Sequence, residues 1–119
     1  MKFFCKIQTP MFEKNENKYI KFLINDDTYK KVVNKHKFSE YFVNNIDYEN
    51  PLYGNILTVK VPFRYRRVMC TYEGAPVQAL QKNDEVFIEV DFMGSWNKGN
   101  YSGMSWKLKY IKLIDAHIP

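Results

Sequence analysis

The sequence predicts a mainly β fold, a small barrel of five to six antiparallel strands with one inserted helical segment. Several short apolar stretches alternate with a period of two and are separated by turn residues. Only residues 27–44 have apolar side chains at helical spacing. No β-α alternation recurs along the chain, which argues against a doubly wound sheet. Short antiparallel strands with a single helix instead favour a five-stranded Greek-key barrel.

Length and composition fit one globular domain that spans residues 1–119. The chain is 45% hydrophobic and 26% charged, which is ordinary for a folded protein. It has no long apolar run typical of a membrane span, and its first residues do not resemble a signal peptide. We therefore expect a protein of the cytoplasm, the host cell cytoplasm if the protein is viral, with no membrane partner.

The first half of the chain predicts a hairpin followed by the helix. Residues 2–7 form a short apolar run that Pro10 is expected to stop, residues 13–17 are a polar turn, and residues 18–24 are a second strand. Residues 27–44 fit one helix, or two short ones broken near residues 36–38, that would begin at one of three N-cap candidates, which are Asp26, Asp27 and Thr28.

The longest strand-like stretch covers residues 56–70. Its alternation places Phe63 and Tyr65 on the apolar face, where the core is the favoured environment for both. Pro62 lies in the middle of the stretch, so we expect a bend, a bulge or a sheet edge there. A strongly bent strand is what a small barrel needs to close.

The second half predicts a short helical turn or loop at residues 77–84 and a final hairpin. Residues 85–93 alternate cleanly, residues 94–103 form a Gly-containing hairpin loop, and residues 104–114 form the last strand. Trp106 lies within that strand and is expected in the core. Trp96 and Tyr101 lie in the polar loop, where burial is harder to arrange and contact with a ligand is favoured.

No catalytic or metal-binding motif stands out. The two cysteines, Cys5 and Cys70, are expected to be free thiols in the core, and His36 and His117 are not at ligand spacing from them. A Gly-rich phosphate loop and a recognisable Ser-His-Asp arrangement are both missing. We therefore expect no cofactor, no metal and no enzymatic activity.

The charges are segregated along the chain. The net charge is +5, which alone says little about partners. Residues 53–72 and residues 93–114, however, contain no Asp or Glu although the chain has 13 acidic residues. Lysines and arginines in both windows alternate with aromatic residues. Cations displace the counterions of a phosphate chain, and unpaired bases stack on rings with little regard to sequence.

These windows predict a groove for single-stranded nucleic acid. Glu89 and Asp91 point outward from residues 85–93 and would repel phosphates, so we expect this strand to face away from the groove or to flank it, which limits the site to one side of the barrel. The candidate binding residues are Lys60, Arg64, Tyr65, Arg66, Arg67, Tyr72, Trp96, Lys98, Tyr101, Lys107 and Lys109.

The C-terminal half resembles a known family. "LQKNDEVFIEVDF", a Gly-containing loop and "GMSWKLKYIKLI" resemble the last hairpin of OB-fold single-stranded DNA-binding proteins of bacteriophages and large DNA viruses. The matching positions are Leu80, Asp84, Val86, Gly103, Met104, Trp106, Leu108 and Ile111. The resemblance covers about a third of the chain. It implies an OB-fold-like barrel that coats single strands cooperatively during DNA replication or recombination.

Two other functions remain open at this stage. The first is a protein-interaction module on an OB scaffold, with Phe38, Tyr41 and Phe42 of the helical segment as its contact surface. The second is an RNA-binding OB protein, since the sequence favours DNA only through the resemblance. Edge strands and surplus aromatic residues permit a homo-oligomer or a cooperative assembly on the strand.

Overall fold

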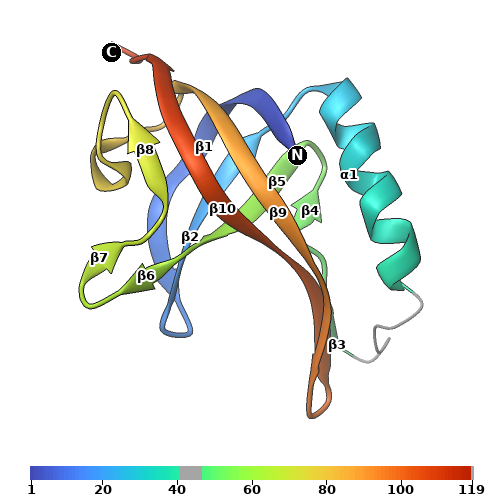
Figure 1. Ribbon diagram of the computed structural model, residues 1–119. Helices are drawn as coiled ribbons and strands as arrows, with labels where there is room; N and C mark the ends of the chain where they lie inside the picture. The colour runs from blue at the N-terminus through green and yellow to red at the C-terminus, as the bar shows by residue number, and fades with distance from the viewer. Residues whose placement is uncertain (41–46, 119) are drawn as a thin grey trace.

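The computed structural model describes residues 1–40 and 47–118 and shows a curled sheet closed into a ring of five strands (Figure 1). Around the ring the neighbours are β1 (Lys2–Lys14), β2 (Asn17–Leu23), β5 (Ile56–Val61), β10 (Tyr101–Asp115) and β9 (Glu85–Lys98), which pairs again with β1. This is the strand order of an OB-type barrel, and the predicted mainly β fold with one inserted helix is confirmed. One contact differs from expectation, because β5 meets β10 in parallel at Lys60 and Lys107.

Shorter elements decorate the ring. They are α1 (Asp26–Ser39), β3 (Asp47–Glu49), β4 (Leu52–Tyr53), β6 (Phe63–Arg64), β7 (Arg67–Val68), β8 (Thr71–Glu73) and the 3₁₀ turn η2 (Val77–Ala79). Strands β3 and β8 pair in parallel with β10, and β4 pairs with β5. Strands β6 and β7 pair with each other alone, as a separate ribbon.

Strand β1 is longer than the sequence indicates because Pro10 does not end it. The strand pairs with β9 through residues 2–6 and with β2 through residues 6–14. Register shifts between Ile7 and Thr9 and between Thr9 and Phe12 mark the bend between these two halves. Pro10 lies inside the irregular stretch, where a missing backbone donor is tolerated. The bend lets one strand serve both sides of the barrel.

The core follows the predicted alternation. Ring strands bury every second side chain, including Phe22, Leu57, Val59 and Ile88. Trp106 is only 1% exposed, so its predicted place in the core is confirmed. Both cysteines are buried and unpaired, and burial raises the pKa of the Cys70 thiol to about 11.

Helix α1 begins at a cap that the sequence analysis missed. The N-cap is Asn25, whose Oδ1 accepts a hydrogen bond of 2.8 Å from the backbone N–H of Thr28. Asp26 and Asp27 instead occupy the first turn, where carboxylates complement the helix dipole. The described helix ends at Ser39, and residues 41–44 of the predicted segment lie outside the described residues.

A buried hydrogen bond joins α1 to the barrel. Val32 and His36 are the buried side chains of its inner face, and Nε1 of Trp106 donates to Nε2 of His36 at 2.9 Å. The His36 ring also packs against Phe92 of β9, with 5.5 Å between the ring centroids. No helix in the described ranges is long and apolar enough to cross a membrane.

Two segments differ from the sequence prediction. The strand predicted over residues 56–70 ends at Val61, and after Pro62 the chain folds into the β6–β7 hairpin. The loop predicted over residues 94–103 is instead mostly strand, because β9 and β10 remain paired as far as Lys98 and Tyr101. Both differences produce hairpins that extend beyond the ring (Figure 1).

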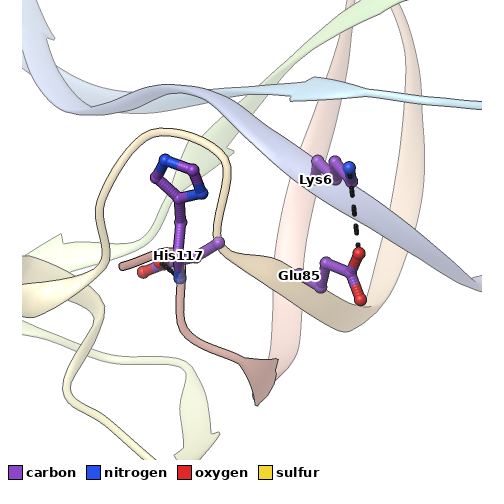
Figure 2. A network of polar contacts seen from close by, with 4 residues as sticks. Lys6, Glu85 and His117 are labelled. Atoms are coloured by element: carbon purple, nitrogen blue, oxygen red, sulfur yellow. Dashed lines mark hydrogen bonds and ion pairs between the residues drawn. The ribbon is translucent and has the colours of Figure 1, made fainter. Parts of the chain in front are cut away.

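The C-terminal segment is held against the barrel by Asp84. This buried carboxylate accepts one hydrogen bond from the backbone N–H of Gln81 and another from that of His117, both at 2.8 Å. Figure 2 shows the same corner, where Nζ of Lys6 also lies 3.8 Å from a Glu85 carboxylate oxygen. These contacts fix where the chain leaves the last strand.

Candidate nucleic-acid interface

A groove crosses the barrel on the outer face of β2 and β5. Two adjoining hollows form it, and they share the lining residues Asn17, Lys60, Ser105 and Trp106. The β1–β2 turn borders the groove, the β9–β10 hairpin lies at one end, and β6 lies at the other. In Figure 1 the β1–β2 turn and the β9–β10 hairpin project toward the lower side of the barrel, and the β6–β7 hairpin projects to its left.

The groove is lined by cations and aromatic rings. Its basic residues are Lys14, Lys18, Lys21, Lys60, Arg64, Lys98 and Lys107, and its accessible aromatic residues are Phe12, Tyr19, Tyr53, Phe63 and Trp96. Trp106 also borders both hollows, but it is only 1% exposed. Two acidic residues, Glu16 and Glu49, also contribute to the lining. Cations outnumber carboxylates strongly, which makes the groove attractive to a polyanion.

Strand register explains how residues distant in sequence meet at the groove. Phe12 of β1 pairs with Tyr19 of β2, Tyr19 pairs with Lys60 of β5, and Lys60 pairs with Lys107 of β10. Side chains of directly paired residues lie on the same face of a sheet. The result is one outward row that crosses four strands, with two rings followed by two cations.

Five cations of the groove form no ion pair with the side chains that the structure describes, namely Lys21, Lys60, Arg64, Lys98 and Lys107. The other two are paired at its border, Lys14 with Glu49 at 3.9 Å and Lys18 with Glu13 at 3.2 Å. An unpaired surface cation remains available to a phosphate oxygen. The groove therefore presents uncompensated positive charge.

The lysines on the later part of β10 are arranged differently. Lys109 lies 3.9 Å from Glu89, and Lys112 lies 3.8 Å from Glu73. Lys6 on β1 is likewise within ion-pair distance of Glu85. Strand β10 thus carries a lysine without an ion pair where the strand borders the groove. Its later part, which does not border the groove, carries ion-paired lysines.

The Trp96 ring is positioned by a glycine on the neighbouring strand. Trp96 pairs with Gly103 across β9 and β10 and is half-buried in the groove lining. A Cβ at position 103 would lie 2.9 Å from Cζ2 of Trp96 and 2.6 Å from the carbonyl oxygen of Glu49 in β3. Only glycine allows β3 and this ring to approach β10 so closely.

The fold has a solved counterpart. The single-stranded DNA-binding protein gp2.5 encoded by bacteriophage T7 superposes with a TM-score of 0.53, over 100% of this chain and 93% of that chain, at 8% sequence identity. The chain has the fold of that phage protein. No protein-family model matches the sequence, and neither does any curated protein. The likeness is therefore one of architecture, and it agrees with the OB-type barrel expected from the C-terminal half.

Five of the predicted site residues line the groove: Lys60, Arg64, Trp96, Lys98 and Lys107. They come from β5, β6, β9 and β10, so the two acid-free windows of the sequence do meet in space. Glu89 and Asp91 do not contribute to the lining.

Three more predicted residues, Tyr65, Arg66 and Arg67, lie in the β6–β7 hairpin next to Arg64. The expectation that Tyr65 belongs to the core is wrong, since it is 88% exposed. The hairpin turn reverses the chain at residues 65–66, so the simple alternation that begins in β5 does not continue to Tyr65. Phe63, expected in the core as well, is half-buried and lines the groove.

The remaining three predicted residues lie outside the lining. Tyr101 is exposed beside Lys98, its partner across the β9–β10 hairpin. Tyr72 is on β8, which pairs with the later part of β10, and Lys109 is ion-paired there with Glu89. Their contact with a ligand stays a prediction, and for Tyr72 and Lys109 it requires a surface beyond the groove.

The sequence analysis missed the contribution of the first hairpin. Phe12, Tyr19 and Lys21 line the groove, and Nζ of Lys21 lies 5.6 Å from the centroid of the Phe12 ring. Burial, together with the nearby Glu49 carboxylate, raises the pKa of Tyr19, so its phenol stays a neutral donor. The signal was present, because Tyr19 and Lys21 alternate with the buried Ile20 and Phe22.

The surface expected for a protein partner is described only in part. Phe38 on α1 is exposed, whereas Tyr41 and Phe42 fall outside the described residues. Within the described ranges, no three His, Cys, Asp or Glu side chains come together as a set of metal ligands.

Proposed function

We propose that this protein is a non-enzymatic, sequence-tolerant single-stranded DNA-binding protein that serves viral or phage DNA replication or recombination. The strand would lie in the groove over β2 and β5. Its phosphates would contact the five unpaired cations, and its bases would stack on rings such as Trp96 and Tyr19.

One observation carries this proposal: the groove combines unpaired cations with aromatic rings. Lys60 and Lys107 are paired across strands at the middle of the groove, and neither forms an ion pair with a described side chain, although Asp91 is the register partner of Lys107 on β9. Like charges opposite each other destabilise a sheet, so a bound polyanion would relieve their repulsion. The rings beside them give unpaired bases a surface to stack on.

Two further facts support the same function. In OB barrels the face of the second and third strands, together with the first and last hairpin loops, is where oligonucleotides and oligosaccharides bind. The groove has that position on this barrel. The solved counterpart of the fold is described as a single-stranded DNA-binding protein of a bacteriophage.

The proposal includes the partner and the setting. DNA is preferred to RNA on the basis of the structural counterpart alone, and assembly of several copies along one strand would explain the exposed aromatic side chains. The protein would act in the cytoplasm of the cell in which its DNA replicates. A comparison of oligo-dT with oligo-U of equal length would test the preference for DNA.

The central experiment removes two groove cations and compares the result with a matched removal outside the groove. The double variant Lys60→Gln/Lys107→Gln should weaken binding of oligo-dT at least about tenfold, because two phosphate contacts are lost. The control, Lys6→Gln/Lys112→Gln, removes the same charge from the same barrel but from ion-paired positions that are not among the candidate binding residues. Its affinity should stay within about twofold of wild type.

The two variants have the same net charge, so non-specific attraction affects both equally. Equal loss of affinity in both would place the site elsewhere on the barrel. If the wild-type protein failed to bind oligo-dT or oligo-U at low salt, the nucleic-acid function would be excluded and the protein-interaction alternative favoured.

A further inference from the structure

The β6–β7 hairpin stands apart from the barrel. Phe63 pairs with Val68 and Arg64 pairs with Arg67, and neither strand joins the main sheet. Figure 1 shows this hairpin projecting from the barrel beside the β1–β2 turn. A short isolated ribbon adds little to the stability of a sheet, so its presence calls for another explanation.

Its turn has an unfavourable sequence for its shape. Tyr65 and Arg66 both have positive φ, at 52° and 63°, as a two-residue type I′ turn requires. Asn and Gly are the residues that accept this conformation readily, and large side chains are strained in it. Both other tight hairpin turns have a favourable residue in the first position, Asn15 at φ 51° and Gly99 at φ 60°, although Glu16 follows Asn15 at φ 67°. Only the β6–β7 turn has a large side chain at both positions.

The residues at the strained tip are chemically suited to nucleic acid. Tyr65 is 88% exposed, and Arg64, Arg66 and Arg67 are exposed around it. None of the three arginines forms an ion pair with a side chain that the structure describes. Arginine binds phosphate in bidentate fashion, and an exposed tyrosine ring offers a stacking surface.

The tip is continuous with the groove. Pro62, Phe63 and Arg64 line the groove at the end opposite Trp96, together with Met69, which follows β7. A strand that leaves the groove at this end would therefore meet Tyr65 and Arg66 next. Strain retained at an exposed, charged and aromatic tip points to a binding role rather than a structural one.

We propose that the β6–β7 tip is a second, separable contact for the strand, at which Tyr65 stacks on a base while Arg66 and Arg67 hold the phosphates just outside the groove. This inference rests on the proposed function, since it assumes that a strand occupies the groove. In this inference, the tip contacts the nucleotides that extend beyond the groove. The tip would thus set the length of strand that one molecule covers.

The test exchanges the turn for its preferred sequence. Tyr65→Asn/Arg66→Gly removes the ring and one charge while it relieves the strain, so the melting temperature should rise by about 5 °C. Oligo-dT from about 4 to about 16 nucleotides spans the site sizes of one OB barrel. The variant should bind the shortest strands as tightly as wild type and the longest about tenfold more weakly.

A single variant, Tyr65→Asn, separates the ring from the charge. It should weaken binding of the long strands without changing the dependence of affinity on salt, because stacking releases no counterions. A more stable double variant that binds weakly could not be explained by misfolding.

The outcomes separate this inference from the proposed function. If the double turn variant binds strands of every length as wild type does, the tip is not a contact and the inference is wrong. Lys60→Gln/Lys107→Gln should weaken binding at every length, so the groove is tested independently. If wild type binds no strand at all, the proposed function fails first.

Discussion

Lys60 lies unpaired at the middle of the groove, between Tyr19 on one neighbouring strand and Lys107 on the other. Like charges directly opposite each other destabilise a sheet. Asp91, the register partner of Lys107 on β9, offsets part of that repulsion, but Lys60 forms no ion pair with a described side chain. The facing charges of Lys60 and Lys107 therefore lower the stability of the sheet slightly, while the Lys60 charge remains available to a ligand.

Trp96 should report binding directly. Its half-buried ring lies in the groove, whereas Trp106 is buried and hydrogen-bonded to His36. We expect oligo-dT to quench the emission of Trp96, and we expect Trp96→Ala to reduce affinity by about 5- to 100-fold, the range for one stacked base. Titration of intrinsic fluorescence measures the first effect and gives the affinity for the second.

Trp96→Phe provides the control, because the remaining emission then comes from Trp106. That emission should stay constant as the strand is added. A quench of the same size in Trp96→Phe would show that the signal arises in the core and would contradict a contact at Trp96.

At the scale of residues, the sequence predicted the basic residues of the groove better than its aromatic residues. Lys60, Lys98 and Lys107 were found because acid-free windows are visible in a sequence. Tyr19 was missed because it comes from a strand whose place in the ring only the topology reveals. Tyr65 was assigned to the core because alternation cannot show that a turn has reversed the chain.

Among the elements, α1 depends on one buried hydrogen bond for its place on the barrel. Nε2 of His36 accepts from Nε1 of Trp106, so the imidazole must be neutral there. Burial lowers the pKa of His36 to about 4. The unfolded chain, with a histidine pKa near about 6.5, therefore binds a proton more readily than the folded protein does.

The sign of the pH dependence follows from that difference. The stabilisation is fully present above about pH 6.5 and is lost as the pH falls toward about 4. His36→Gln keeps a neutral acceptor and should lose less stability over this range, as measured by urea unfolding at several pH values. His36→Ala should destabilise the protein by about 1–3 kcal/mol at neutral pH, because the Trp106 donor loses its partner. Parallel pH profiles for wild type and His36→Gln would contradict this role.

The elements themselves were predictable where local chemistry decides them. The alternation of Val86, Ile88 and Val90 predicted a half-buried strand, and residues 77–84 predicted the short 3₁₀ turn that is found. Pro62 was recognised as an irregularity, but a proline can bend a strand or end it, and only packing decides which. The β9–β10 pairing across residues 94–103 overrode the loop character of its glycines and asparagines.

Over the whole molecule, ion pairs with carboxylates are few. Outside the groove, Lys6, Lys109 and Lys112 each have a glutamate partner, whereas the lysines of α1 and the arginines of the β6–β7 hairpin have none among the described side chains. Within the groove, five cations lack such a partner among the described side chains. The sequence revealed the segregation along the chain but could not reveal the pairing, which depends on which strands become neighbours.

The number of unpaired cations in the groove predicts the salt dependence of binding. Each phosphate neutralised on a single strand contributes about −0.7 to the slope of log affinity against log salt concentration. Five unpaired groove cations predict a slope of about −3.5 for a strand that only fills the groove, and contacts at the β6–β7 tip would make the slope for a longer strand steeper. Titrations of oligo-dT between about 50 and 200 mM salt would measure both slopes. Lys60→Gln should make the slope shallower by about 0.7, and Lys112→Gln should leave it unchanged, because the Lys112 charge is already matched by Glu73. A slope near zero for wild type would mean that the rings alone hold the ligand, and the unpaired cations would then need a different explanation.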